Sequence, residues 1–152
     1  MPSLDRFGLA RNWLTSARRF WLRHVKRIDV HQSVRVSLSA DFIPGAAGAI
    51  SIGDHSLIAF KAIIIARDPN GIVRPVWIGR NCFIGGGSLI LPGVTVGNCS
   101  IVGAGSVVDR DVPAGSIVGG NPAVVLRHKI MTGAYGCLIE NTTPEADLRQ
   151  IY

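Results

Sequence analysis

The sequence predicts an all-β solenoid: a parallel β-helix of short strands that follows an N-terminal amphipathic α-helix and precedes a short C-terminal helix. Two observations predict the β-helix. Between Ile78 and Pro113 an aliphatic residue recurs every six residues, and a small or β-branched residue stands four places after each one. A period of six cannot keep an apolar stripe on an α-helix, but it is a multiple of the two-residue period of a strand. Such repeats bury their apolar face by stacking on their neighbours, as in a solenoid.

The repeat also indicates how one coil is built. If each unit is a strand followed by a turn, its first and fifth positions both point inward, and the glycine or asparagine between them forms the turn. Three units then close one triangular coil. The aliphatic first positions are Ile78, Ile84, Ile90, Val96, Val102 and Val108. We expect about four coils in a single domain that spans residues 28–122.

Residues 1–27 carry a helical pattern that precedes the repeats. Apolar residues at spacings of three and four draw one stripe, which Trp13 and Phe20 widen. The stripe consists of Phe7, Ala10, Leu14, Ala17, Trp21 and Val25. A solenoid needs its open end covered, so this helix could cap the coils or pack within a trimer. Because it is also basic, it could make peripheral contact with an anionic membrane surface, and the two roles could coexist.

The register extends upstream of the regular run, with one interruption. The upstream aliphatic positions in phase are Ile28, Val34, Ala40, Ile52, Ile58 and Ile64. The run ARDPNGIVRP, residues 66–75, breaks the phase before Ile78. We therefore expect residues 66–75 to leave the coil as a loop.

The repeat ends before the C-terminal segment, residues 123–152. After Arg127 the sequence has no clear period. Thr143 followed by Pro144 predicts the start of a short helix that continues to Ile151, because proline is favoured at the first helical position. We expect this helix to pack on a coil or on a neighbouring chain.

Composition excludes several classes of protein. No apolar run approaches the ~18 residues that a membrane span requires, and the N-terminus lacks the apolar stretch of a secretory signal. Three cysteines give no disulfide framework, and Cys82 falls on an inward position. The net charge of +6 fits a phosphate-bearing ligand or an anionic surface, but no nucleic-acid-binding motif accompanies it. We expect a cytoplasmic protein that binds no nucleic acid.

Three motifs in the second half of the chain carry a resemblance to a known family. They are LPGVTVG, VGAGSVV and GGNPAVVLR, in that order. With the repeats around them, residues 50–127 resemble the hexapeptide-repeat acyltransferases, in particular the sugar and polysaccharide O-acetyltransferases. The resemblance implies a left-handed β-helix, acetyl-CoA as the acyl donor, a saccharide hydroxyl as the acceptor, and a homotrimer with active sites between neighbouring subunits.

The resemblance also indicates four residues that would bind the coenzyme. Arg110 and Arg127 match basic positions near the coenzyme phosphates, which need fixed cations. Gly86 and Ala104 match small turn residues along which the pantetheine arm would lie. Asp109 stands where relatives often have threonine, and its carboxylate is unfavourable beside a phosphate. No metal is expected.

Acetyl transfer to an alcohol also needs a general base, which is usually a histidine. In the sugar-acetylating relatives this histidine lies in the loop that interrupts the coils, and here it is missing. Asp68 is the candidate base in that loop. For the acceptor, the resemblance indicates Asp41 and Phe83. The histidines of this chain, none of which stands at the matching position, are His24, His31, His55 and His128.

The sequence therefore predicts an acetyl-CoA-dependent O-acetyltransferase that acts on a saccharide, nucleotide-sugar or lipid-linked sugar acceptor, in the cytoplasm or at the inner face of the membrane. The missing histidine keeps an alternative open, a catalytically silent trimer that serves as a scaffold or regulatory partner. A γ-class carbonic anhydrase would share the coil architecture. That enzyme needs three zinc-binding histidines on neighbouring coils, whereas only His55 lies on a regular coil.

Overall fold

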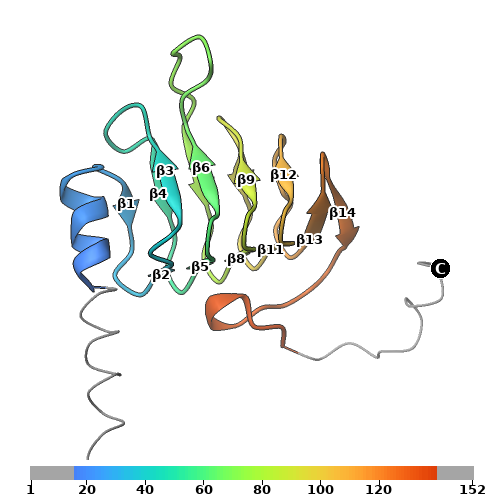
Figure 1. The fold of residues 1–152 in the computed structure, drawn as a ribbon. Helices are drawn as coiled ribbons and strands as arrows, with labels where there is room; N and C mark the ends of the chain where they lie inside the picture. The colour runs from blue at the N-terminus through green and yellow to red at the C-terminus, as the bar shows by residue number, and fades with distance from the viewer. Residues whose placement is uncertain (1–15, 140–152) are drawn as a thin grey trace, which may run out of the picture.

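The computed structural model describes residues 16–139, and this part of the chain winds into a parallel β-solenoid of about four turns. Figure 1 shows the turns side by side, with a helix at one end and an antiparallel hairpin at the other. Each turn contributes one short strand to each of three sheets, here called sheets A, B and C. The architecture confirms the predicted solenoid and is consistent with a left-handed β-helix.

The three sheets run along the length of the solenoid. Sheet A consists of β1 (Asp29–Val30), β4 (Ile50–Ile52), β7 (Val76–Ile78) and β10 (Thr95–Val96). Sheet B consists of β2 (Arg35–Val36), β5 (Leu57–Ile58), β8 (Phe83–Ile84), β11 (Ile101–Val102), β13 (Ile117–Gly120) and β14 (Ala123–Arg127). Sheet C consists of β3 (Asp41–Ile43), β6 (Ile63–Ile65), β9 (Leu89–Ile90) and β12 (Val107–Val108). These strands pair in parallel, except for β13 with β14.

The strand register corrects the predicted phase of the first coil. Val30 pairs with Ile52, so the aliphatic first positions of this coil begin at Val30 and not at Ile28. The three first positions are Val30, Val36 and Phe42. The residues that the sequence placed there, Ile28, Val34 and Ala40, lie two places earlier. Both sets are buried, because both positions face inward, and the apolar pattern alone did not separate them.

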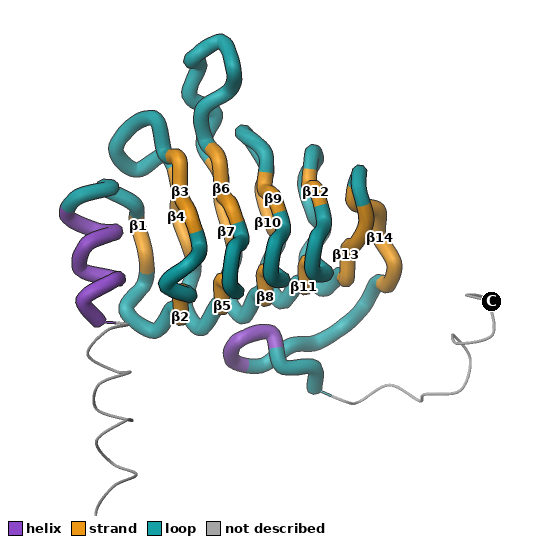
Figure 2. The backbone as a smooth tube through the Cα atoms, viewed as in Figure 1, coloured by secondary structure: helices purple, strands orange, loops and turns teal. Residues whose placement is uncertain are grey.

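Variation in coil length is confined to the corner between sheets C and A. Equivalent residues are 18 apart between the third and fourth coils, but 22 apart between the first two and 26 apart between the second and third. The extra residues form two loops, 44–49 and 66–75, which project from the same edge of the solenoid (Figure 2). The second is the predicted loop, and an antiparallel bridge between Arg67 and Val73 closes it.

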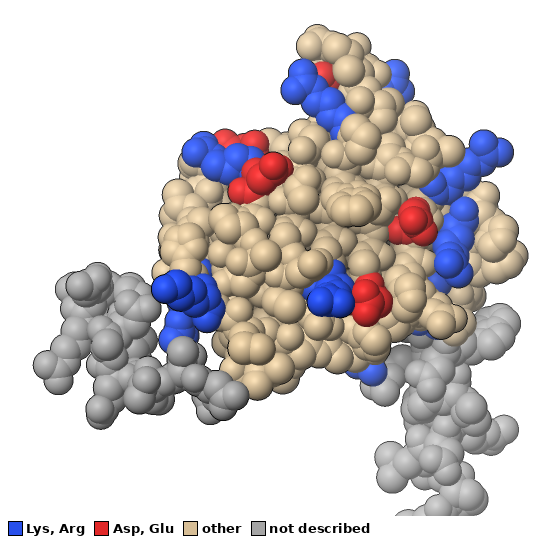
Figure 3. Space-filling view, turned by 180° about the vertical axis from the view of Figure 1, so that it is seen from behind, with Lys and Arg blue, Asp and Glu red and all other residues tan. Residues whose placement is uncertain are grey.

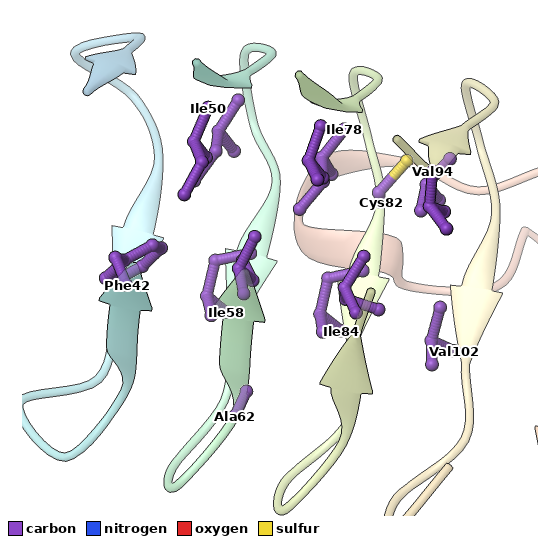
Figure 4. Close-up of a cluster of buried hydrophobic side chains, with 14 of the residues drawn as sticks. Phe42, Ile50, Ile58, Ala62, Ile78, Cys82, Ile84, Val94 and Val102 are labelled. Atoms are coloured by element: carbon purple, nitrogen blue, oxygen red, sulfur yellow. The ribbon is translucent and has the colours of Figure 1, made fainter. Parts of the chain in front are cut away.

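The core is a column of aliphatic side chains inside the coils. Figure 4 shows Ile58, Ile84 and Val102, which come from successive coils and lie in one row. All three are almost completely buried. Burial of a side chain of this size stabilises the folded chain by about 1.5–3 kcal/mol. The stability of each coil therefore depends on the coils next to it.

The second inward position holds small side chains that bind the neighbouring turn. Ser56 is fully buried, and its hydroxyl donates to the Gly79 carbonyl at 2.7 Å. Cys82 takes the same place one coil later, and its thiol donates to the Gly97 carbonyl at 3.2 Å. These bonds satisfy turn carbonyls that burial would otherwise leave without a partner.

Residues 16–24 form the helix, which covers the open end of the first coil (Figure 1). Leu22 enters the core and is fully buried. The side chains of Arg18 and Lys26 donate to the carbonyls of Ala40 and Phe42, at 2.7 and 3.1 Å. Two basic residues at the helix thus satisfy backbone acceptors at the exposed end of the solenoid.

The contacting side of the helix differs from the predicted stripe. Trp21 and Val25 are 37% and 63% exposed, whereas Leu22, outside the stripe, is buried. The part of the stripe before residue 16 lies outside the described residues. A coil end presents carbonyls as well as aliphatic side chains, so the helix that covers it combines leucine with arginine and lysine. The spacing of apolar residues alone does not identify such a contacting side.

Among the described residues, no helix has the length and apolar character needed to cross a bilayer.

The last described segment, residues 128–139, returns along the corner between sheets A and B. The Ile130 amide donates to the Gly115 carbonyl at 2.9 Å, and the Tyr135 amide donates to the His55 carbonyl at 2.6 Å. The segment therefore connects the last coil with the second and passes beneath the coils in Figure 1. A short 3₁₀ turn, Ala134–Gly136, lies within it. The predicted C-terminal helix, from Thr143 to Ile151, lies outside the described residues.

Leu22→Ala tests whether the helix closes the core. We expect it to lower the free energy of unfolding by about 2–5 kcal/mol, because it leaves a cavity at the end of the aliphatic column. Phe20→Ala is the matched control on the same helix, since Phe20 is 63% exposed, and it should change stability by less than about 0.5 kcal/mol. Urea unfolding at one fixed protein concentration measures both. Equal losses would contradict the cap.

The cysteines should differ in reactivity. Cys82 is buried, and burial raises the pKa of its thiol, whereas Cys137 is exposed. A thiol reacts as the thiolate, so Cys82 should resist modification in the native protein. Labelling with a thiol reagent at about pH 8, a little below the pKa of an ordinary thiol, followed by peptide mass mapping, should modify Cys137 and spare Cys82 until denaturant is added. Early labelling of Cys82 would show that its coil opens readily.

Candidate active site

Two of the predicted coenzyme residues, Gly86 and Ala104, lie together at the corner between sheets B and C, here called the BC corner. Gly86 follows β8 and Ala104 follows β11, and these strands pair in register. The Gly105 amide donates to the Gly86 carbonyl at 2.9 Å, which joins the two turns directly. A Cβ at Gly87 or Gly105 would meet no atom within 4 Å. The BC corner therefore offers open backbone on two successive coils.

Phe60 borders the BC corner one coil earlier. The Gly87 amide donates to the Phe60 carbonyl at 2.9 Å, and the Phe60 side chain is 62% exposed. A Cβ on Gly86 would lie 2.7 Å from the ring atom Cζ, so a larger residue there would have to displace the exposed ring. The sequence analysis assigned no role to Phe60. The available signal was an aromatic residue at a turn position where the following units have glycine or alanine.

Arg110 lies at the corner between sheets C and A, where its partner is the neighbouring Asp109. Its Nε is 3.0 Å from Asp109 Oδ1, and a second guanidinium nitrogen donates to Oδ2 at 3.2 Å. These hydrogen bonds lower the pKa of Asp109 and raise that of Arg110. The Arg110 side chain is 72% exposed, and a guanidinium has five N–H donors. Arg110 can thus receive a phosphate beside its present partner, but the carboxylate opposes a second anion.

Arg127 lies at a different place from the other predicted coenzyme residues. It ends β14 and pairs with Ile117 at the beginning of β13, on the side of sheet B that adjoins sheet A. Arg110 is at the opposite edge of sheet A. Within one chain the described residues therefore bring Gly86 and Ala104 together, but they place the two arginines at other corners.

Asp68 organises the loop in which it lies. Its Oδ1 accepts the Ile72 amide at 2.9 Å, and its backbone carbonyl accepts the Gly71 amide at 2.9 Å. Its Oδ2 lies 3.5 Å from Arg74 Nε, and the side chain is 13% exposed. A carboxylate has about four lone-pair sites, so Asp68 retains capacity to accept a further proton donor. The side chain nevertheless already stabilises the turn of its own loop.

The structure brings the Asp68 loop against the irregular loop of the first coil. A Cβ at Gly45 would lie 2.8 Å from Arg67 Cβ, and the φ of +71° at Gly45 also favours glycine. Asp41 lies just before this first loop, on β3. Its side chain is exposed, and its Oδ1 accepts the Phe42 amide at 2.8 Å. The segments that carry Asp41, a predicted acceptor residue, and Asp68, the candidate base, are thus neighbours.

Phe83 is separated from these segments. It lies on the outward face of sheet B, half-buried, and a Cβ on Gly136 would meet its side chain. Gly136 belongs to the returning segment, residues 128–139, which therefore covers part of Phe83. Asp41 lies on sheet C. In one chain, Phe83 and Asp41 face different sides of the solenoid.

The BC corner and the Asp68 loop lie at opposite edges of sheet C. The loop follows β6, whereas the BC corner immediately precedes β9, the strand that pairs with β6. The width of sheet C therefore separates the predicted coenzyme site from the candidate base of the same chain.

One histidine has a carboxylate partner in the described part of the chain. His55 Nδ1 lies 3.2 Å from Asp54 Oδ2, and this hydrogen bond lowers the pKa of Asp54. The His55 ring is tilted against Tyr135, with ring centroids 6.3 Å apart. Both members of the pair are nearly half exposed, on the corner between sheets A and B. His31, His24 and His128 are also exposed.

No group of three or more metal-ligating side chains occurs within residues 16–139. Charged side chains instead occur as small groups of mixed sign. Figure 3 shows the molecule from behind, with a largely uncharged surface on which acidic and basic side chains lie next to one another, near the edges and in the lower middle of the face. The pair of Asp109 and Arg110 and the pair of Asp68 and Arg74 are such groups.

Comparison with known proteins agrees with the fold and the motifs. Residues 75–110 match the family model described as bacterial transferase hexapeptide (six repeats). A protein of Escherichia coli strain K12, named "Putative colanic acid biosynthesis acetyltransferase WcaF", is 35% identical over 92 residues, which are 56% of this chain and 50% of that protein. The chain spans about half the length of the curated relatives that it matches.

Solved structures show the same solenoid. The hexapeptide-repeat acetyltransferase VCA0836 from Vibrio cholerae O1 biovar eltor, solved with acetyl coenzyme A, has a TM-score of 0.59 and 28% identity, over 84% of this chain and 79% of that chain. The polySia-specific acetyltransferase NeuO has a TM-score of 0.64 and 22% identity, over 81% of this chain and 58% of that chain, which shows the fold alone. The comparisons confirm the resemblance to the hexapeptide-repeat acyltransferases.

Proposed function

We propose that the protein transfers the acetyl group of acetyl-CoA to a hydroxyl group of a saccharide. The observation that carries the proposal is the BC corner, where Gly86 and Ala104 stand on successive coils and leave the backbone open. The likeness to a hexapeptide-repeat acetyltransferase solved with acetyl coenzyme A supports the donor. The name of the Escherichia coli relative, which refers to colanic acid biosynthesis, supports a saccharide acceptor.

In this proposal the pantetheine arm lies along the BC corner. The arm carries two amides, which need backbone partners, and it is narrow enough to pass beside glycine and alanine turns. Phe60 forms an apolar wall at one end of the corner, next to Gly86. The resemblance implies that Arg110 and Arg127 bind phosphate groups of the coenzyme, which must then extend beyond the BC corner, because both arginines lie at other corners of the chain. Arg110 does so while keeping Asp109 as its neighbour, which weakens its attraction for an anion.

The transfer step requires removal of a proton from the acceptor hydroxyl. The hydroxyl oxygen attacks the thioester carbonyl, a carbon–oxygen bond forms, and the carbon–sulfur bond breaks to release the coenzyme thiolate. Asp68 accepts the hydroxyl proton through a free lone pair of its carboxylate, and the proton then passes to the thiolate. Arg74, at 3.5 Å from Oδ2, holds the carboxylate in place. The acceptor contacts Asp41 and the two neighbouring loops.

The proposed assembly is a homotrimer. Sheet C presents an outward row of aliphatic residues that suits packing against a second copy: Ile63, Leu89 and Val107. The exposed side of the helix, with Phe20, Trp21 and Val25, remains available for peripheral membrane contact. Such contact would suit a lipid-linked sugar acceptor, and a nucleotide-sugar would be the acceptor in its absence.

Ala104→Trp tests the BC corner. The indole would fill the open space beside Gly105, so we expect acetyl-CoA binding to weaken by about tenfold or more, which corresponds to about 1.4 kcal/mol. Leu38→Trp is the matched control, because Leu38 is 56% exposed and takes the equivalent turn position two coils before Gly86. Isothermal titration with acetyl-CoA measures both variants. Unchanged binding to Ala104→Trp would exclude the BC corner as the coenzyme site.

Asp68→Asn tests the chemistry without removing the loop contact, since the amide oxygen still accepts the Ile72 amide. We expect the rate of saccharide-dependent thiol release from acetyl-CoA to fall by about 10² or more, the range for loss of a general base. Asp111→Asn is the control, because Asp111 also accepts a backbone amide, that of Thr95 at 2.7 Å. Full activity in Asp68→Asn would show that another group is the base. Coenzyme binding without thiol release in the unaltered protein would support the catalytically silent trimer.

A further inference from the structure

Trp77 is an exposed aromatic residue on the outward face of sheet A. It lies on β7, directly before the inward residue Ile78, and its side chain is 63% exposed. In register with it on the neighbouring coils are Ser51 and Thr95. Both neighbours are small, so the indole stands on the sheet with free space on each side of it along the solenoid.

A hollow of about 590 Å³ surrounds Trp77. The turn glycines Gly53, Gly79 and Gly97, which repeat from coil to coil, line it. Polar residues with both donors and acceptors also line it, and they are here called the rim residues: Arg23, Asp29, His31, Asp54, Arg80 and Asn98. The two arginines and two aspartates balance in charge, so the hollow favours neither an anion nor a cation.

The outward faces of the three sheets differ in chemistry. On sheet B the row in register is Arg35, Leu57, Phe83, Ile101 and Ile117, and on sheet C it is Asp41, Ile63, Leu89 and Val107. From the second coil onward both rows are apolar, and residues 128–139 cover part of sheet B, as expected of surfaces that pack against protein. On sheet A the row is Asp29, Ser51, Trp77 and Thr95, in which the only large apolar group is one planar ring.

A sugar has the chemistry that this face recognises. One face of a pyranose ring is made of C–H groups and packs on an aromatic plane, whereas its hydroxyls both donate and accept hydrogen bonds. Trp77 supplies a large planar apolar surface. Carboxylates accept hydrogen bonds, guanidinium groups donate them, and the Asn98 amide does both. The balance of charge at the rim fits neutral sugar units.

We propose that the outward face of sheet A around Trp77, here called the platform, binds a neutral oligosaccharide. One sugar ring stacks on Trp77, and its hydroxyls bond to the rim residues. This inference rests on the proposed function and names its acceptor as an extended glycan. The Asp68 loop runs directly into β7, and Arg74, the partner of Asp68, is three residues before Trp77. A chain of several sugars can therefore contact both the loop and the platform, whereas a single sugar reaches one of them.

Titration of the full chain with maltohexaose, mannohexaose, chitohexaose and xylohexaose tests the platform. The indole N–H signal of Trp77, assigned by its loss in Trp77→Phe, should shift with at least one hexasaccharide. Trp77→Ala should raise the half-saturating concentration by about tenfold, and Trp77→Phe should raise it less because a smaller ring remains. Phe20→Ala is the matched control, since Phe20 is also 63% exposed and should leave binding unchanged.

Three outcomes would overturn the platform. They are no shift with any of the four hexasaccharides, equal binding by the unaltered protein and Trp77→Ala, and loss of the oligomer in Trp77→Ala. The last outcome, measured by light scattering, would show that this face joins copies of the chain. Thiol release is a separate readout: if it is absent while the Trp77-dependent shift persists, the transferase proposal fails and the platform stands. If the platform and the transfer are both correct, Trp77→Ala should lose the preference for a hexasaccharide over its monosaccharide.

Discussion

The spacing between stacked coils is the constraint on which the rest of the structure depends. Parallel strands lie about 4.8 Å apart, and the turns between them must repeat at the same distance. Little room remains there for a side chain: a Cβ on Gly53 would lie 2.8 Å from the Arg80 amide nitrogen, and one on Gly97 would lie 2.7 Å from Ala114 Cα. Side chains inside the coils are equally restricted in size, because the inward residues of every strand pack in one continuous aliphatic column. The chain can therefore vary at its outward residues and where it leaves the stack, and the candidate chemistry is found at those places.

Stacking also leaves backbone groups without partners at the two ends, and the chain closes each end differently. At the first coil, Arg18 and Lys26 donate to carbonyls and Leu22 fills the core. At the last coil, β14 folds back on β13 and pairs with it in antiparallel fashion, which protects that edge from pairing with another chain. Part of the positive charge of the N-terminal region thus has a structural role. Less positive charge is therefore available to bind phosphate groups or a membrane surface than the net charge alone indicates.

The sequence predicted the solenoid correctly because a period of six places two residues of every unit inside, whatever the phase. The same property explains the error at Ile28: the loop at residues 44–49 shifts the phase by two, and both phases present aliphatic residues. The adjacency of Gly86 and Ala104 was predictable, since they are separated by one regular coil of 18 residues. The contact between Phe60 and Gly86, the cover over Phe83 and the engagement of Asp68 with its own loop were not. These contacts depend on the directions of individual side chains and on residues 128–139, which have no sequence period. The six-residue repeat therefore gives no information about them.

The separation of the BC corner from the Asp68 loop determines how the proposed reaction can be arranged. Both belong to sheet C, but they lie at its two edges, and the paired strands β6 and β9 hold that distance fixed. A rigid sheet cannot bend to bring its edges together, so one chain cannot place its own candidate base at a thioester bound along its own BC corner. The proposed reaction therefore requires a second copy whose loop reaches the BC corner of the first. The projecting loops at residues 44–49 and 66–75 are suited to this, because they extend beyond the edge of the stack. If the coenzyme binds along the BC corner and Asp68 is the base, as proposed, the site must therefore be shared between neighbouring copies.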